Sequence, residues 1–412
     1  MTISAGAPDI LSPEFEADPY SAYEILREDY PVLWHDGLGR YIISRYEDVS
    51  RAFKDATVFS SEHYADQIEP LHGRTMLQMD GREHTVHRSV VTPAFRGHEL
   101  SEKYIPLIDA GAKKLIDSFR RDGSVDLVSQ FTRLYPVNVI MDMLALPSDH
   151  RDEFRVWYKT MFGFIKNVAG DPAITALAMQ TKVEFREYML PLISQRRQNP
   201  GADLLSTLCT AEIDGTRFTD EEINSFCSVL FVSAGETTDS SIGSIFRNLL
   251  DNPEQLEAVK RDRSLISSAF AETLRFSPPG HMFGRRVKQD VEIAGTRIEA
   301  GKDVILLIGA ANRDPRKYAD PGRFDIFRPD LDTAKAYSAG ANHTAFGLGR
   351  HFCVGAMLSK AEVEIGVGLL LDSMGDVKYQ EGFAPRESGV WTRGLDELLL
   401  DFNPRTPSQP ID

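Results

Sequence analysis

A ten-residue stretch near the C-terminal end surrounds one cysteine with three glycines, aromatic residues and a basic pair. It reads Phe346-Gly347-Leu348-Gly349-Arg350-His351-Phe352-Cys353-Val354-Gly355, and a helical pattern follows from about Val354. Glycines let a backbone turn tightly and approach a ligand closely. Backbone N–H groups and a nearby aromatic ring can tune a sulfur that binds a metal. The stretch therefore predicts that Cys353 is a thiolate ligand of haem iron, onto which a thiolate pushes electron density.

Other kinds of site fit this stretch poorly. A dinucleotide-binding loop would need a third glycine where Phe352 stands, and a phosphate-binding loop would end in Gly-Lys-Ser or Gly-Lys-Thr. A zinc site would need a second cysteine at Cys-x-x-Cys spacing. A plain buried thiol would not need three glycines around it. The cofactor-binding residues predicted in this stretch are Phe346, Gly347, His351, Cys353 and Gly355.

A second set of residues pairs an acid with an alcohol inside a long helical pattern. The pattern begins with a Thr219–Glu222 capping box. Its middle reads Ser233-Ala234-Gly235-Glu236-Thr237-Thr238, although glycine inside a helix costs about 1 kcal/mol relative to alanine. The small residues Ala234 and Gly235 would leave space for the haem and dioxygen, so Ala234 is predicted to contact the cofactor.

Glu236 and Thr237, beside that space, are the predicted catalytic pair. A hydroxyl with a carboxylate behind it can relay protons from water to a reacting oxygen. Thr238 is the alternative alcohol, and Thr237 is preferred because it keeps Glu236 in the acid position. The non-functional alternative is an ordinary helix turn with a solvated glutamate.

His84 and Arg88 are four residues apart, so they share one face of a helix. Two donors on one face suit the anionic haem propionates, which arginine can bind with two parallel hydrogen bonds. The alternative is a solvated helix face, but the Cys353 loop favours the cofactor interpretation. His87 faces another side and is predicted to be structural.

Composition limits the classes of protein to which this chain can belong. It has 412 residues, of which 42% are hydrophobic, and a formal net charge of −15, which argues against nucleic acid or an anionic membrane as partner. Its N-terminus has no apolar run long enough for a signal peptide or membrane anchor. Three cysteines imply no disulfide framework. These features predict a cytoplasmic protein without a membrane partner.

Strand and helix patterns occupy separate parts of the chain. Strand-rich parts are expected at about 30–60, 285–310 and 385–403, and helical parts at about 80–280 and 350–375. Segregated elements predict a mostly helical α+β fold. Because the motifs from His84 to Cys353 serve one site, residues 1–412 are predicted to form a single domain.

The chain resembles the cytochrome P-450 family, of the soluble prokaryotic type, over essentially its whole length. In family order, it carries Glu16-Ala17-Asp18-Pro19-Tyr20, the His84/Arg88 helix, the acid-alcohol helix, a Glu-x-x-Arg pair, Ala311-Asn312-Arg313-Asp314-Pro315 and the Cys353 loop. The resemblance implies a triangular prism of long helices with a small β-rich region, and haem b (iron protoporphyrin IX) as cofactor. It also implies monooxygenation, in which one atom of O₂ enters a C–H bond and the other leaves as water.

The resemblance assigns further roles to charged residues. Arg285 would bind a haem propionate, with Arg286 on the opposite face of a strand, and His351 would bind a propionate as well. Glu272 and Arg275 touch at i, i+3 spacing. The resemblance makes them part of a structural network whose third member is Arg323.

The resemblance implies a substrate pocket that is mainly apolar, as ligand pockets generally are. Ordinary core packing is the alternative for each residue, and a hydrophobic small molecule is the expected substrate. The predicted lining residues are Phe231, Val232, His281, Met282, Phe283, Val390 and Trp391.

Electrons are expected from a separate ferredoxin and its NAD(P)H-dependent reductase, with the enzyme as a monomer. The 59 residues after Cys353 are too few for a reductase domain. Residues 343–360 carry Arg350 and Lys360 but no acid, so they could attract an acidic ferredoxin. The alternatives are a peroxide-driven haem-thiolate peroxygenase, a haem-thiolate isomerase or dehydratase, and a non-catalytic haem-binding or sensor protein.

Overall fold

The computed structural model describes residues 6–167, 170–213 and 215–405. The chain forms two compact units. The first unit contains residues 1–60, 112–134 and 237–412, and the second contains residues 61–111 and 135–236. The chain passes from one unit to the other four times, so neither is a continuous stretch of sequence. The prediction of a single domain stays a prediction.

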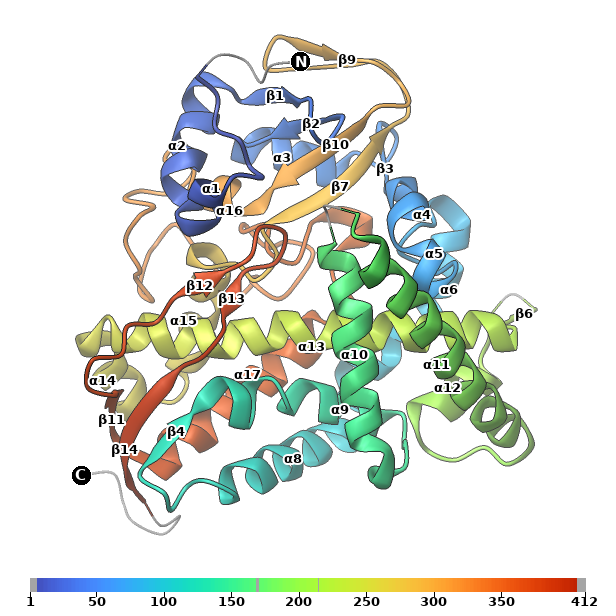
Figure 1. Ribbon diagram of the computed structural model, residues 1–412, viewed down its shortest axis with the longest axis vertical. Helices are drawn as coiled ribbons and strands as arrows, with labels where there is room; N and C mark the ends of the chain where they lie inside the picture. Colours follow the sequence, from blue (N-terminus) through green and yellow to red (C-terminus); the bar gives the residue numbers. More distant parts are fainter. Residues whose placement is uncertain (1–5, 168–169, 214, 406–412) are drawn as a thin grey trace. The chain divides into compact units, whose positions relative to one another are not determined.

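The first unit contains the main sheet, whose five strands lie in the order β1-β2-β10-β7-β3 (Figure 1). β10 pairs in parallel with β2 and antiparallel with β7. Its residues Val304, Ile305, Leu306 and Leu307 are all buried, as expected for a central strand covered on both faces. The strands of the sheet are β1 (Val32–His35), β2 (Arg40–Ile43), β3 (Phe59–Ser60), β7 (Met282–Val287) and β10 (Asp303–Leu307).

Helices and smaller sheets complete the first unit. The helices that lie wholly within it are α1 (Pro13–Ala17), α2 (Pro19–Asp29), α3 (Tyr46–Lys54), α14 (Pro253–Arg261), α15 (Leu265–Phe276), α16 (Ile308–Ala311) and α17 (Ala356–Ser373). The other strands are β4 (Ser124–Asp126), β8 (Val291–Ile293), β9 (Thr296–Ile298), β11 (Met374–Tyr379), β12 (Glu387–Ser388), β13 (Gly394–Leu395) and β14 (Leu399–Pro404).

The second unit is almost entirely helical, and its two long helices α10 and α11 lie side by side (Figure 1). Its α-helices are α4 (Tyr64–Gln67), α5 (Glu69–His72), α6 (Gly81–Val91), α7 (Gly97–Glu99), α9 (Tyr135–Met143), α10 (Arg151–Lys166), α11 (Pro172–Gln198) and α12 (Leu204–Thr210). Strand β5 (Glu212–Ile213) pairs antiparallel with β6 (Thr216–Arg217). Two helices, α8 (Ile105–Asp117) and α13 (Asp220–Leu250), have residues in both units.

The long helix α13 begins where the sequence predicts. The Glu222 carboxylate accepts hydrogen bonds from the backbone N–H and the hydroxyl of Thr219, at 2.7 and 2.8 Å, and the Glu222 N–H donates back to that hydroxyl. The reciprocal bonds satisfy N–H groups that a helix start leaves without an intrahelical partner. The predicted capping box is confirmed.

The predicted segregation of strands and helices is confirmed. Strands β1 and β2 fall within 30–60, strands β7 to β10 lie at 282–307, and strands β12 to β14 lie at 387–404. The fold is therefore mostly helical with a small strand-rich part. No helix of the described residues is long and apolar enough to cross a membrane.

A buried carboxylate organises the segment that follows α15. Glu272 and Arg275 are fully buried and form an ion pair of 2.6 Å. The third side chain is that of Arg328, which lies 3.1 Å from Glu272 and is only 4% exposed. The prediction of Arg323 as third member is wrong, because its side chain is exposed and only its backbone carbonyl is used, as acceptor from Arg275 and Arg328.

The corrected network predicts unequal effects of two arginine substitutions. Removing one partner of a buried ion pair costs about 3–5 kcal/mol, because a charge stays buried without compensation. We expect Arg328→Ala to lower the free energy of unfolding, measured by urea denaturation, by about 3 kcal/mol. Arg323→Ala should change it by less than about 0.5 kcal/mol, because the backbone carbonyl remains. Equal losses would contradict the assignment of Arg328.

Candidate functional site

The loop that carries Cys353 is closed by its own backbone. The Cys353 N–H donates to the Phe346 carbonyl at 2.8 Å, and the Phe352 N–H donates to the Gly349 carbonyl at 3.2 Å. Gly349 has a φ of +70°, and a Cβ there would lie 2.9 Å from the Phe53 carbonyl. Only glycine fits both the backbone angle and this approach. The loop therefore presents the cysteine on a fixed backbone frame.

The Cys353 sulfur lies near the start of helix α17. A Cβ on Gly355, the residue that caps this helix, would lie 3.8 Å from the sulfur. A helix N-terminus carries partial positive charge, which favours a thiolate over a thiol. The helical pattern expected from Val354 begins at Ala356.

The other two cysteines are unsuited to be thiolate ligands. Cys209 and Cys227 are buried, whereas Cys353 is exposed. Burial raises the pKa of Cys209 to about 11, and burial raises the pKa of Cys227 further. Both stay protonated at neutral pH, so Cys353 is the cysteine available to bind a metal.

Arg285 comes close to the Cys353 loop through a shared neighbour, Phe53. The Arg285 guanidinium lies 5.1 Å from the centre of the Phe53 ring, and a Cβ on Gly347 would lie 3.6 Å from the same ring. Arg286, the next residue of β7, points to the other face and forms an ion pair of 2.9 Å with Asp303. The alternation follows from the period of two residues along a strand.

The charge of Arg285 fits an anionic ligand. Arg285 is 4% exposed. Among residues 6–167, 170–213 and 215–405 its guanidinium pairs with no carboxylate. Its Nη1 donates to the Gly284 carbonyl at 2.7 Å. Burying a guanidinium without a counter-ion is costly. A propionate-bearing cofactor beside an available thiolate would supply that counter-ion, so the residues of this unit fit haem.

The two threonines of the predicted relay have different surroundings. Thr238 is 2% exposed, and its hydroxyl donates to Ser359 of α17 at 3.4 Å. Thr237 is half-buried, and its carbonyl accepts from Ser241 at 2.7 Å. A buried hydroxyl that is already engaged with another helix is less suited to exchange protons with water. The two threonines therefore differ in burial, and the choice of Thr237 as the relay alcohol stays a prediction.

Glu236 is held by two side chains of α10. Lys166 Nζ lies 2.9 Å from one carboxylate oxygen, and the Tyr158 hydroxyl donates to the other at 3.3 Å. Lys166 also lies 4.5 Å from the centre of the Phe162 ring. No local pattern in the sequence indicates these partners, since they precede Glu236 by 70 and 78 residues.

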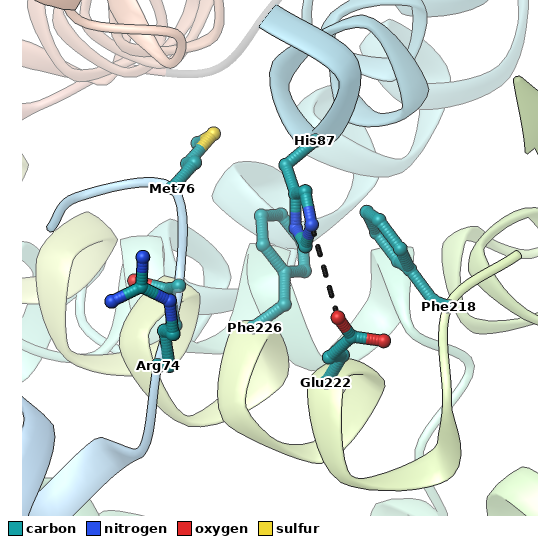
Figure 2. A pocket seen from close by; sticks show the side chains of 7 residues that line it. Arg74, Met76, His87, Phe218, Glu222 and Phe226 are labelled. Atoms are coloured by element: carbon teal, nitrogen blue, oxygen red, sulfur yellow. Dashed lines mark ion pairs between the residues drawn. The ribbon is translucent and has the colours of Figure 1, made fainter. Parts of the chain in front are cut away.

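The predicted propionate donors of the second unit lie on helix α6, as the spacing requires. His84 is 3% exposed and Arg88 is half-buried. His87 lies elsewhere on this helix, 3.8 Å from Glu222, and lines a small pocket with Arg74, Phe218 and Phe226 (Figure 2). The volume of this pocket, about 10 Å³, leaves room for roughly one water molecule and none for a substrate.

The predicted substrate residues fall into two groups. Phe231 packs against Phe154 and Tyr158 of α10, with ring centroids 5.5 and 5.9 Å apart, so core packing is the better interpretation for it. Val232 is also buried. The half-buried side chains, which are the better candidates for a ligand surface, are Phe283, Val390 and Trp391.

His281 and Met282 belong to the core beside α2. The Tyr23 hydroxyl lies 2.8 Å from His281 Nδ1, and the His281 side chain is almost fully buried. Met282 lies in the hydrophobic cluster that contains Tyr23. Because the His281 ring and the Met282 sulfur are enclosed by protein, the structure does not support the prediction that these two residues line a pocket. Ordinary core packing is the better interpretation for both.

The basic segment expected to dock a ferredoxin is less basic than its sequence suggests. Lys360 forms an ion pair of 3.2 Å with Glu364, one turn further along α17. Arg350 lies in the 3₁₀ turn Gly349–His351, before the cysteine. The charge contributed by this segment therefore comes mainly from Arg350.

Comparisons with known proteins agree on one family. Residues 13–374 match the family description Cytochrome P450. Pulcherriminic acid synthase of Bacillus subtilis (strain 168) is 36% identical over 395 residues, which cover 96% of this chain and 97% of that protein. The solved structure of cytochrome P450 CYP109Q5 from Chondromyces apiculatus has a TM-score of 0.86 and 31% identity, covering 97% of this chain and 98% of that one.

A further solved structure contains a ligand. CYP109E1 from Bacillus megaterium in complex with testosterone has a TM-score of 0.83 and 28% identity, covering 94% of this chain and 99% of that one. The fold predicted from the sequence is confirmed by these likenesses.

Buried His281 predicts a loss of stability in acid. Burial, with smaller effects of Arg393 and Arg313, lowers the pKa of His281 from 6.5 to about 3. Below about pH 6.5 the unfolded chain binds a proton at this residue while the folded chain does not. The contribution of neutral His281 to the free energy of unfolding is therefore complete above pH 6.5 and is lost as pH falls toward 3. Between pH 7 and pH 5 the loss is about 2 kcal/mol.

A glutamine at position 281 removes the titrating group. We expect His281→Gln to be less stable than the natural protein at pH 7, but to lose about 2 kcal/mol less between pH 7 and pH 5, measured by urea denaturation. His98→Gln, at an exposed position, should keep the natural pH dependence. An unchanged slope in the His281 variant would show that the imidazole is not held neutral.

Proposed function

We propose, for a chain that belongs to the cytochrome P450 family, that Cys353 is the haem ligand of an enzyme oxidising a hydrophobic small molecule. Membership makes the protein a monooxygenase that binds haem b through a cysteine thiolate. The observation that carries the residue assignment is the closed loop that presents Cys353, the exposed cysteine, at the start of α17.

Bound haem b activates dioxygen, so that one oxygen atom enters the substrate and the other leaves as water. The surrounding residues would favour the ionised sulfur and hold the loop that carries it. The N-terminus of α17 stabilises the negative charge of the thiolate. Phe346 packs edge-on against Phe352, with ring centroids 6.0 Å apart, and this contact joins the two ends of the loop.

We assign the propionate contacts to basic residues. Arg285 supports this role best, because its buried guanidinium needs an anionic partner. His351, within the cysteine loop, and His84 and Arg88, on α6, complete the proposed set. Ala234, with its small side chain, leaves space on α13 for the cofactor.

We assign proton delivery to Thr237 and Glu236. The Thr237 hydroxyl would donate a proton to the reacting oxygen, and Glu236 would replace it from water. In the described structure Lys166 and Tyr158 hold the Glu236 carboxylate, so it cannot turn toward the threonine without first exchanging these partners.

The proposed substrate is hydrophobic, and Phe283, Val390 and Trp391 are its proposed contacts. These side chains are large, apolar and half-buried, as a ligand surface requires. The likeness to CYP109E1, whose solved structure holds testosterone, supports a hydrophobic substrate without naming one.

We propose that a ferredoxin and its NAD(P)H-dependent reductase supply the electrons, and that they dock near Arg350. A positive side chain beside the cysteine loop of a chain with net charge −15 would attract an acidic donor. The proposed cytoplasmic location rests on cysteine usage, because a chain of this length with three cysteines implies no disulfide framework.

A turnover comparison tests the proposed function. The purified protein would be supplied with a compound chosen by its spin-state shift, first with NADPH, ferredoxin and ferredoxin reductase, and then with hydrogen peroxide alone. Product in the first reaction supports the proposal. Product with peroxide alone identifies a peroxygenase, and absence of product in both points to a haem-binding or sensor protein.

Cys353 should be required for the thiolate spectrum. We expect the reduced carbon-monoxide complex to show the red-shifted Soret band of thiolate ligation, and Cys353→Ala to abolish it, because no other cysteine is available as a thiolate. Cys209→Ala and Cys227→Ala are the matched controls and should keep the band. Retention of the band in Cys353→Ala would refute the central assignment.

Thr237 and Thr238 should differ in their effect on coupling. We expect Thr237→Ala to raise the peroxide released per NADPH consumed and to lower product formation by about ten-fold or more, because a positioned proton donor is lost. Thr238→Ala should change both quantities much less, since its hydroxyl is buried against Ser359. The reverse order would move the relay to Thr238.

A further inference from the structure

The hairpin of β12 and β13 carries two of the proposed substrate contacts in its turn (Figure 1). Val390 and Trp391 lie between Gly389 and Thr392, and both side chains are half-buried. Within the described residues, Trp391 Nε1 and Thr392 Oγ1 are buried and have no hydrogen-bond partner. The polar side chains of the turn therefore do not hold it in place.

Backbone bonds join the turn to the neighbouring segment before β7. The His281 N–H donates to the Trp391 carbonyl at 2.8 Å, and the Arg393 N–H donates to the Pro279 carbonyl at 2.8 Å. These bonds hold the end of the turn at Trp391 and Arg393. At the other end, the Gly389 N–H donates to the Glu16 carboxylate at 3.1 Å.

The Arg393 side chain adds further hydrogen bonds at the Gly389 end of the turn. Its guanidinium donates to the Gly389 carbonyl at 3.2 Å, to the Glu16 carbonyl at 2.6 Å and to the Ala17 carbonyl at 3.4 Å. Its Nε lies 3.3 Å from Glu387, and both side chains are 5% exposed. One side chain thus connects the two ends of the turn with helix α1.

Glu387 continues the connection to helix α13. Its second carboxylate oxygen lies 3.0 Å from Arg247, which also donates to Ser277 at 3.2 Å. Next to this ion pair the backbone of the hairpin touches the helix, because a Cβ on Gly394 would collide with the Ser240 hydroxyl oxygen and lie 2.9 Å from the Ser240 Cβ. A larger residue at position 394 therefore requires the hairpin or Ser240 to move.

We propose that Arg393, acting through Glu387 and Arg247, is a positioning residue that fixes the turn Gly389–Thr392 and thereby determines which ligands the enzyme accepts. The inference rests on the proposed function of Val390 and Trp391. The planar guanidinium is essential to it, because lysine carries the same charge but cannot donate in four directions.

The first experiment replaces the guanidinium but keeps the charge, in the haem-containing protein. Dissociation constants of imidazole and 1-benzylimidazole are measured by Soret titration for the natural protein, Arg393→Lys and Arg297→Lys. Arg297 pairs with Asp290 at the surface and is the matched control. We expect Arg393→Lys to raise the dissociation constant of 1-benzylimidazole about ten-fold and that of imidazole less than about two-fold. Arg297→Lys should change neither.

The second experiment moves the hairpin without changing a charge. We expect Gly394→Ala to reproduce the selective loss of 1-benzylimidazole, because its methyl group collides with Ser240. Adding Ser240→Gly removes the colliding atoms and should restore the affinity. Amide hydrogen exchange of residues 387–395 should accelerate in Arg393→Lys and in Gly394→Ala. It should return to the rate of the natural protein when Gly394→Ala is combined with Ser240→Gly.

The outcomes separate this inference from the proposed function. A reduced carbon-monoxide complex without the thiolate band in the natural protein would refute the function before any variant is made. With that band intact, an equal change in the dissociation constants of both azoles, or no change in either constant, would overturn the role of Arg393. Selective loss with rescue by Ser240→Gly supports it.

Discussion

The buried Glu272 carboxylate is the constraint on which the position of the cysteine loop depends. It fixes Arg275, whose Nη1 donates to the Asn312 carbonyl at 3.2 Å. The Asn312 side chain in turn accepts from both the N–H and the hydroxyl of Thr344, each at 2.8 Å, at the residue where the loop region begins. A charge without access to water thus orders a chain of hydrogen bonds that ends at the segment carrying Cys353. Such networks are strong only when every member is satisfied, which explains why Arg328 completes this one.

Local pattern predicted the parts of the fold that local physics decides. The strands at 32–35 and 40–43, the capping box at Thr219 and the cysteine loop all follow from periodicity, side-chain capping and glycine geometry. The same reasoning separated Arg285 from Arg286, because neighbouring residues of a strand point to opposite faces. In each case the residues that form the feature lie within a few positions of one another.

Partners that come from distant parts of the chain could not be predicted in this way. The sequence offers Arg323 and Arg328 five residues apart, and only the path of the loop decides which side chain turns toward Glu272. His281 is a core residue because Tyr23 of α2, which is 258 positions away in the sequence, lies against its ring. Lys166 reaches Glu236 across 70 residues for the same reason. Sequence identifies the chemistry of a group, whereas tertiary packing selects its partner.

The burial of Cys209 and Cys227 has a consequence for the durability of the enzyme. Peroxide is one product of a monooxygenase cycle that fails to deliver oxygen to its substrate, and thiolates are the form of cysteine that peroxide oxidises to sulfenic and sulfinic acids. With the pKa of Cys209 raised to about 11, and that of Cys227 raised further, these side chains hold almost no thiolate at neutral pH. Cys209 and Cys227 are therefore poor targets for peroxide.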